Sequence, residues 1–167
     1  MVQVSRKFTA MQTKAPTIIR SRKHEELVQN LAIKKLNDMD ISIFPTIREL
    51  LCFAALLGFS EKRKVPLDRS FGVEDISWQQ FYGNSAGDLV FLLALAETKK
   101  PEILKDGEEA QCAEIFQEYA NGGLEIISEA LLKHGAEYPE KDIIAYLQEN
   151  NFIEVDDKDG DFAGVTF

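Results

Sequence analysis

The chain has 167 residues, of which 45% are hydrophobic, so it is long enough for one domain with a substantial core. Its apolar runs, such as Leu89–Ala96, are far shorter than the roughly 20 residues that span a bilayer, and Met1–Arg22 lacks the apolar core of a signal peptide. Cys52 and Cys112 stand far apart in apolar contexts, which is typical of free thiols in a reducing compartment. We therefore expect a soluble cytoplasmic protein without a membrane partner.

The formal net charge of −9 is unevenly distributed. Residues 1–64 contain 12 Lys and Arg against 6 Asp and Glu, whereas residues 65–167 contain 7 against 22. This polarity favours a basic end that approaches nucleic acid or an acidic protein, and an acidic body that does not. The alternative is solubility charge that is unevenly placed without a function, and the sequence does not separate the two.

Residues 1–22 predict a flexible basic arm, since they carry several cations, no acidic residue, and Pro16 among scattered Ser and Thr. Such an arm either becomes ordered on a polyanion or is an ordinary frayed terminus. The segment His24–Asn37 then has apolar residues at helical spacing and predicts an amphipathic helix.

The segment after it predicts a core helix over Pro45–Leu57. Thr46 and Glu49 have the spacing of a capping box, and Gly58 is placed to end the helix. The helix is apolar nearly all round, which is typical of a buried element. A basic loop, Lys62-Arg63-Lys64, follows. Two helices and a basic loop allow a helix-turn-helix interpretation, but a recognition helix needs an exposed polar face, which this helix lacks.

Residues 64–81 form a turn-rich connector in which Val65 and Ile76 could pair as short strands. Aromatic residues at its end, Trp78, Phe81 and Tyr82, predict anchoring of the connector on the core. Stacking of one of these rings on an exposed base is the functional alternative.

The rest of the chain predicts further helices over Asp88–Glu97, Pro101–Leu104, Glu108–Ala120, Leu124–His134 and Pro139–Asn150, with Ile143, Ile144 and Leu147 of the last one facing inward. Asn121-Gly122-Gly123 is expected to separate two of them. The predicted fold is all-α, a single compact domain of about six helices over residues 23–152, with the basic arm before it and an acidic and then apolar tail over residues 153–167.

Patterns that carry chemistry are absent from the sequence. Two histidines and two isolated cysteines give no zinc spacing. The acidic tail does not fit a calcium loop, because counting back from Gly160 places Val155 at the first ligand position. Residues 83–87 are small and precede a helix, which suits helix entry better than phosphate binding. We therefore expect no enzyme activity, no catalytic residues, no metal and no cofactor.

Nucleic-acid contact has candidates in two basic groups. They are Arg20, Arg22 and Lys23 near the arm, and Lys62, Arg63 and Lys64 in the basic loop. Phosphate contacts from such residues would give affinity that is independent of sequence and sensitive to salt.

Several motifs resemble one family. They are the Phe53–Phe59 stretch FAALLGF with the following KRKVPL, then ISWQQF at Ile76–Phe81, LLALA at Leu92–Ala96 and EYANGGL at Glu118–Leu124. Their order and spacing over Arg22–Leu132 resemble the DNA phosphorothioation (Dnd) system-associated protein 4 family. The resemblance implies a bacterial accessory protein of a system that modifies DNA with backbone sulfur, or restricts DNA that lacks it. It supplies no catalytic residues.

Three functional hypotheses remain open from the sequence. The first is a non-enzymatic accessory component of a phosphorothioation-linked modification and restriction (anti-phage) system that acts through its protein partners, with DNA-backbone contacts as an optional addition. The second is a stand-alone DNA-binding regulator that holds double-stranded DNA through the basic N-terminal part. The third is an acidic inhibitor that masks a basic DNA-binding partner through residues 97–161.

Overall fold

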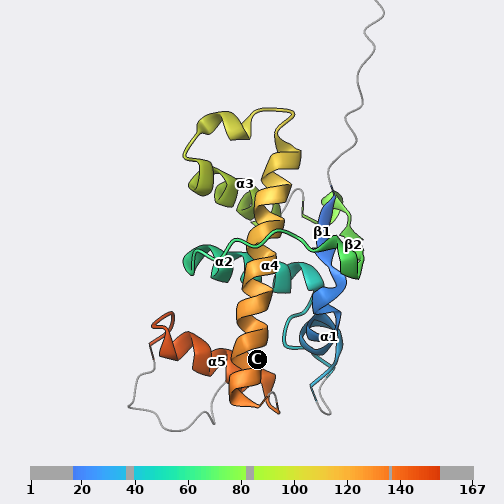
Figure 1. The fold of residues 1–167 in the computed structure, drawn as a ribbon, viewed down its shortest axis with the longest axis vertical. Coiled ribbons are helices and arrows are strands. Elements are labelled where there is room, and N and C mark those ends of the chain that lie inside the picture. The colour runs from blue at the N-terminus through green and yellow to red at the C-terminus, as the bar shows by residue number, and fades with distance from the viewer. Residues whose placement is uncertain (1–16, 37–39, 82–84, 136, 155–167) are drawn as a thin grey trace, which may run out of the picture.

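A computed structural model describes residues 17–36, 40–81, 85–135 and 137–154. In these ranges the chain forms five α-helices and one two-stranded sheet. The fold is therefore predominantly helical as predicted, but the sheet corrects the all-α prediction and the helices number five instead of about six. The elements are β1 (Ile18–Ser21), α1 (Glu25–Val28), α2 (Ile47–Ser60), β2 (Val73–Ile76), α3 (Ser85–Thr98), α4 (Glu109–His134) and α5 (Pro139–Glu149). The long helix α4 runs through the middle of the molecule, and α2, α3, α5 and β1 pack against it (Figure 1).

Helix α4 is continuous where the sequence predicted a break. Asn121, Gly122 and Gly123 all lie within it and are buried. The two glycines instead permit close approach: a Cβ at Gly123 would lie 1.8 Å from the Ala54 carbonyl oxygen of α2, and one at Gly122 would lie 1.9 Å from the Arg63 carbonyl oxygen. The residues that suggested a turn are therefore the points at which α4 is held between α2 and the connector.

Helix α2 has the predicted cap, but it begins at Ile47 instead of Pro45 and ends later than predicted. The Thr46 side chain accepts a hydrogen bond from the Glu49 backbone N–H at 3.2 Å, which confirms the cap. Gly58 does not stop the helix, which continues to Ser60. A Cβ at Gly58 would lie 2.2 Å from the Tyr119 carbonyl oxygen, so this glycine also serves the crossing of α2 with α4.

The sheet corrects two expectations about the N-terminal part and the connector. β1 and β2 pair antiparallel, with Ile18 opposite Ile76, so residues 18–21 of the predicted flexible arm form a buried strand. Residues 1–16 of that arm lie outside the described residues. Val65 is not in the sheet: its backbone N–H donates to the Glu118 carbonyl of α4 at 3.0 Å.

The aromatic anchors of the connector are confirmed where the structure describes them. Trp78 is 7% exposed and meets Phe91 edge to face, and the fully buried Phe81 meets Phe116 in the same way. The burial of Trp78 and Phe81 leaves neither ring free to stack on a base. Tyr82 lies outside the described residues.

Two other helices differ from expectation in detail. The predicted helix from His24 begins as a 3₁₀ turn, runs through α1, and continues as a wider π-helical turn over Gln29–Ile33. In α5, Ile143 is buried as predicted, but Ile144 is 42% exposed. The described part of the chain has no helix that is both long and apolar enough to cross a membrane. Of the predicted tail, residues 155–167 lie outside the described ranges.

Candidate interaction site

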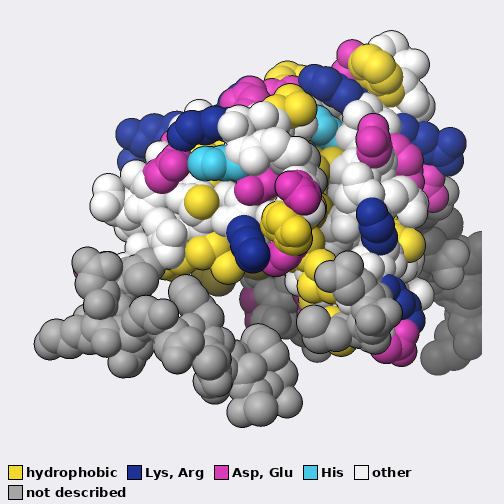
Figure 2. Space-filling model, turned by 90° about the horizontal axis from the view of Figure 1, so that it is seen from below, with side chains coloured by type: hydrophobic (Ala, Val, Ile, Leu, Met, Phe, Trp, Pro, Cys, Tyr) yellow, Lys and Arg dark blue, Asp and Glu magenta, His cyan; other side chains and the backbone are white. Residues whose placement is uncertain are grey.

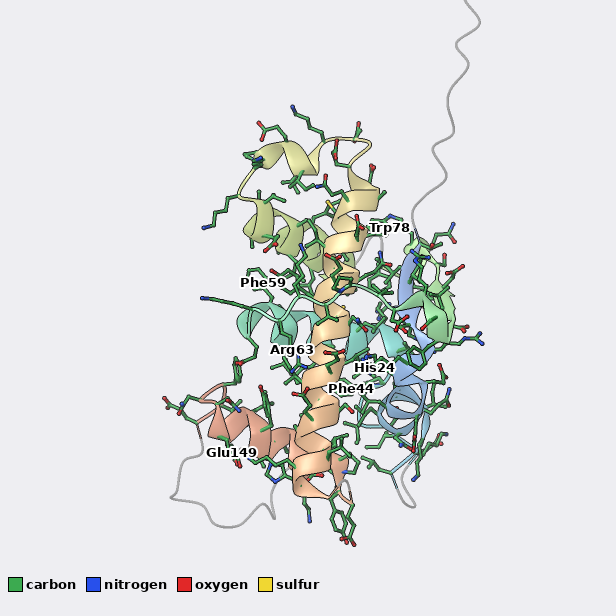
Figure 3. The ribbon with its side chains drawn as sticks, in the orientation of Figure 1. His24, Phe44, Phe59, Arg63, Trp78 and Glu149 are labelled. Atoms are coloured by element: carbon green, nitrogen blue, oxygen red, sulfur yellow. The ribbon has the colours of Figure 1, made fainter. Side chains whose placement is uncertain are left out.

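The predicted basic loop lies directly on α4, because the connector after α2 crosses α4 at Gly122. Arg63 points along α4 toward its carboxylates (Figure 3). Its guanidinium binds Glu129 with two hydrogen bonds, Nη1 to Oε2 at 2.7 Å and Nη2 to Oε1 at 2.6 Å, and Glu125 with a third at 3.0 Å. Paired bonds of this kind are strong and fix geometry. They raise the pKa of Arg63, chiefly through Glu129, and lower the pKa of Glu129.

Lys64 is held by a second group of acidic residues. Its Nζ lies 3.1 Å from Glu97 of α3 and 3.4 Å from Glu118 of α4. The Tyr119 hydroxyl donates to the other oxygen of Glu97 at 2.5 Å. That bond, followed by the one from Lys64, lowers the pKa of Glu97, whereas burial and Glu97 raise the pKa of Tyr119 to about 12. Lys64 therefore joins the connector to both α3 and α4.

The three cations near β1 are also paired. Arg20 is 5% exposed, and its Nη1 lies 2.7 Å from Glu25 Oε2. Arg22 donates to Glu74 on the neighbouring strand at 2.7 and 3.1 Å. Lys23 Nζ lies 2.8 Å from Glu125, the carboxylate that Arg63 also contacts.

Lys62 differs from the other five predicted cations. It is exposed, its backbone is left-handed with φ of 54°, and it makes no ion pair with any described residue. The structure thus brings Lys23 and Arg63 together around Glu125. It places Lys64 of the connector against Glu118, on the same helix. It buries Arg20 in the core, places Arg22 on the sheet, and leaves Lys62 facing solvent.

The carboxylates Glu118, Glu125 and Glu129 stand at helical spacing in the sequence, where they suggest no more than a solvated face. Their role as partners of the basic loop was missed, because spacing along one helix does not show which distant cations approach it. In the view of Figure 2, Lys and Arg side chains lie beside Asp and Glu, and no large area of one sign covers that face.

Behind the ion pairs lies a buried polar cluster of Arg20, His24 and Asn121. Asn121 Nδ2 donates to the carbonyls of Val65 and Pro66 at 3.3 and 3.1 Å, which fastens the connector to α4. His24 is 6% exposed; burial, followed by the charge of Lys23, lowers its pKa, so it is neutral at pH 7. The buried neutral histidine and the paired arginine present no group to solvent.

Groups that could perform chemistry are sparse in the described ranges. No cluster of three or more His, Cys, Asp or Glu side chains there could hold a metal ion. Cys112 is fully buried, and burial raises the pKa of Cys52 to about 11, so the reactive thiolate is disfavoured at neutral pH.

Comparison with known proteins identifies the family to which the chain belongs. No curated protein and no solved structure matches the chain. A family model does match, over residues 17–165, which includes β1, the basic loop and all of α4. The chain therefore belongs to the family described as DNA sulphur modification system-associated protein 4.

Proposed function

We propose that this protein is a non-enzymatic accessory component of a bacterial DNA sulphur modification system, and that it acts by binding other proteins of that system. The observation that carries the proposal is the internal pairing of its candidate DNA-binding cations. Within the described part of the chain, Arg20, Arg22, Lys23, Arg63 and Lys64 all lie against the protein's own carboxylates. Electrostatic affinity for DNA comes from cations that replace counterions at phosphates, and a cation that is already paired must first give up its carboxylate.

The low reactivity of the two thiols and the burial of His24 support the part of the proposal that the protein is not an enzyme. Nucleophilic catalysis needs a nucleophile activated by a nearby base or by a lowered pKa. Cys52 has a raised pKa, Cys112 is buried, and His24 is enclosed beside Arg20. A role in assembly requires none of these groups to react.

The test has two parallel measurements on the same preparation. In the first, the protein is co-expressed with the other proteins of the system and purified through a tag on this chain. In the second, its affinity for duplexes with and without phosphorothioate is measured by fluorescence anisotropy at low and physiological salt. We expect a stoichiometric complex with a system protein and no duplex binding at physiological salt. Tight duplex binding by the isolated chain, without any protein complex, would contradict the proposal.

DNA contact is a second candidate because Lys62 is exposed and unpaired within the described residues. Under this alternative the chain is a DNA-binding regulator. Lys62→Glu should then remove duplex binding at low salt without changing the melting temperature. Lys141→Glu, at an exposed lysine of α5, is a control with the same change in charge.

Masking of a basic partner is a third candidate, because several carboxylates at the start of α4 and just before it are exposed. They are Glu102, Asp106, Glu108 and Glu114. A complex that depends on them should weaken as salt is raised, since exposed charges are screened within about 10 Å at 0.1 M ionic strength. A complex that is indifferent to salt would indicate apolar contacts instead.

A further inference from the structure

A small internal cavity lies among residues of β1, α2, the connector and α4. Its volume is about 10 Å³. Most of the residues that line it are apolar, and four are polar: Arg20, Ser21, Gln117 and Asn121. One water molecule needs a cavity of roughly 10–15 Å³, so this cavity is the size of a single water and too small for a larger ligand.

Two of the polar lining residues have buried atoms without a hydrogen-bonding partner. Arg20 and Asn121 are each 5% exposed. Arg20 Nη1 lies against Glu25, but Arg20 Nε has no acceptor among the described residues. Asn121 Nδ2 donates to two carbonyls of the connector, whereas Asn121 Oδ1 has no donor in the same ranges. Buried donors and acceptors in folded proteins are nearly always satisfied, by another protein group or by an ordered water, because an unpaired one is costly.

The other two polar lining residues are engaged elsewhere. Ser21 Oγ donates to a carbonyl of the connector at 2.8 Å and accepts from the Lys23 backbone N–H at 3.2 Å. Gln117 Oε1 accepts from the Ile19 backbone N–H at 3.0 Å. These bonds fix both side chains in place, and neither side chain is bonded to the unpaired donor or to the unpaired acceptor at the cavity.

We propose that this cavity is the binding site of one water molecule, which accepts a hydrogen bond from Arg20 Nε–H and donates one to Asn121 Oδ1. A water is donor and acceptor at once, so a single molecule satisfies both buried atoms. His24 lies beside the Asn121 amide but does not line the cavity, and an amide oxygen accepts two hydrogen bonds, so His24 does not take the place of the water.

The water links segments that are far apart in the sequence. Arg20 belongs to β1, and Asn121 belongs to α4 and also holds the connector. The bound water is therefore part of the junction that fastens the N-terminal strand and the basic loop to the central helix. The site does not depend on which protein of the system the chain contacts.

The first test is a high-resolution crystal structure of the full chain. We expect a water in the cavity, within roughly 2.7–3.2 Å of both Arg20 Nε and Asn121 Oδ1, in every independent copy of the molecule. Well-ordered side chains with no water density between them would overturn the proposal. A direct hydrogen bond from Arg20 Nε to Asn121 Oδ1 would overturn it equally.

The second test measures the polarity of the cavity in solution with two substitutions of similar size. Ala120 lines the cavity and is 4% exposed. Serine there adds a hydroxyl that can make the bonds of the water, whereas cysteine adds a small, mainly apolar group. The two residues have similar helix propensities. In urea unfolding under reducing conditions, Ala120→Ser should have a midpoint at least about 0.5 M above that of Ala120→Cys, because cysteine displaces the water and leaves two polar groups unpaired.

Ala130 supplies the matched control, since it is 5% exposed on the same helix and does not line the cavity. At this apolar position the order should reverse, with Ala130→Cys at least as stable as Ala130→Ser. Circular dichroism establishes that all four variants are folded. An Ala120→Cys variant that is as stable as Ala120→Ser would show that the cavity is apolar space, and the proposal would be wrong.

Discussion

Replacement of Gly123 by alanine tests whether the crossing of α2 and α4 determines the fold. Alanine would normally stabilise a helix interior by about 1 kcal/mol relative to glycine. Here its Cβ would lie 1.8 Å from the Ala54 carbonyl oxygen, and ordinary contacts begin at 3.4 Å. Because that atom belongs to the main chain of a buried helix, no side-chain rotation relieves the overlap. The two helices must separate by about 1.5 Å to restore contact distance.

The expected cost follows from this separation. Overpacking of a core costs about 1–3 kcal/mol, and a clash between two helix backbones belongs at the upper end of that range. After subtraction of the gain in helix propensity, Gly123→Ala should lower the free energy of unfolding by about 2 kcal/mol. With an urea m-value of about 2 kcal/mol/M, the unfolding midpoint falls by about 1 M.

The assay is urea unfolding followed by circular dichroism, with Gln111→Ala as the control. Gln111 is exposed on the same helix, so its replacement should change stability by no more than about 0.5 kcal/mol. Gly122→Ala should cost less than Gly123→Ala, since its Cβ would meet the Arg63 carbonyl of a connector, which moves more readily than a helix. A Gly123→Ala protein with an unchanged or higher midpoint would refute the reasoning.

Two further predictions concern ion pairs and pH. Arg63→Ala should lower the free energy of unfolding by about 1 kcal/mol. The value is small because the side chain is 34% exposed and solvent screens its ion pairs. Lys62→Ala should have no measurable effect on urea unfolding. Because the pKa of His24 is lowered in the folded protein, the unfolded state binds more protons at mildly acidic pH. The stability that neutral His24 confers is therefore complete above pH 6.5 and is lost as pH falls through the folded pKa. Thermal melts between pH 8 and pH 5 should show this loss, and a His24→Gln variant whose stability falls equally over that range would contradict the assignment to His24.

The errors of sequence interpretation at glycine have one physical cause. Gly58 and the Gly122-Gly123 pair look like helix-ending residues, because glycine is the commonest residue just beyond a helix. Helical periodicity describes each segment alone, and the closeness of two helices is a property of the pair. The cap at Thr46 was predictable because it depends only on residues three positions apart. A rule that depends on neighbouring residues succeeded at Thr46. It failed at the glycines, where contact with the backbone of a distant segment determines the structure.

The candidate site shows the same limit. The cations and the carboxylates of α4 could each be identified in the sequence. That Lys23, Arg63 and Lys64 pair with those carboxylates depends on the connector's path over Gly122 and on β1 lying beside α4. Strand β1 itself was missed, because its four residues include Arg20 and follow a segment rich in cations and polar residues. A short strand is identified mainly by its partner, and here the partner, β2, lies about fifty residues further along the chain.

The ion pairs also determine how DNA contact must be tested. Reversal of charge at Arg63 would remove the cross-link to α4 together with any phosphate contact, so lost binding would not separate the two causes. The informative change is Glu125→Gln with Glu129→Gln, which keeps the size of both side chains and releases the guanidinium. If the basic loop is placed to meet phosphate, this variant should bind a duplex more tightly than the wild type. The slope of the logarithm of its affinity against the logarithm of the salt concentration should be steeper by about 0.9 for each cation released.

Glu102→Gln with Glu114→Gln changes the net charge equally at exposed carboxylates and is the control. If both variants gain the same affinity, the effect is one of overall charge; if the folded Glu125 and Glu129 variant binds no DNA even at low salt, the basic loop serves the fold alone.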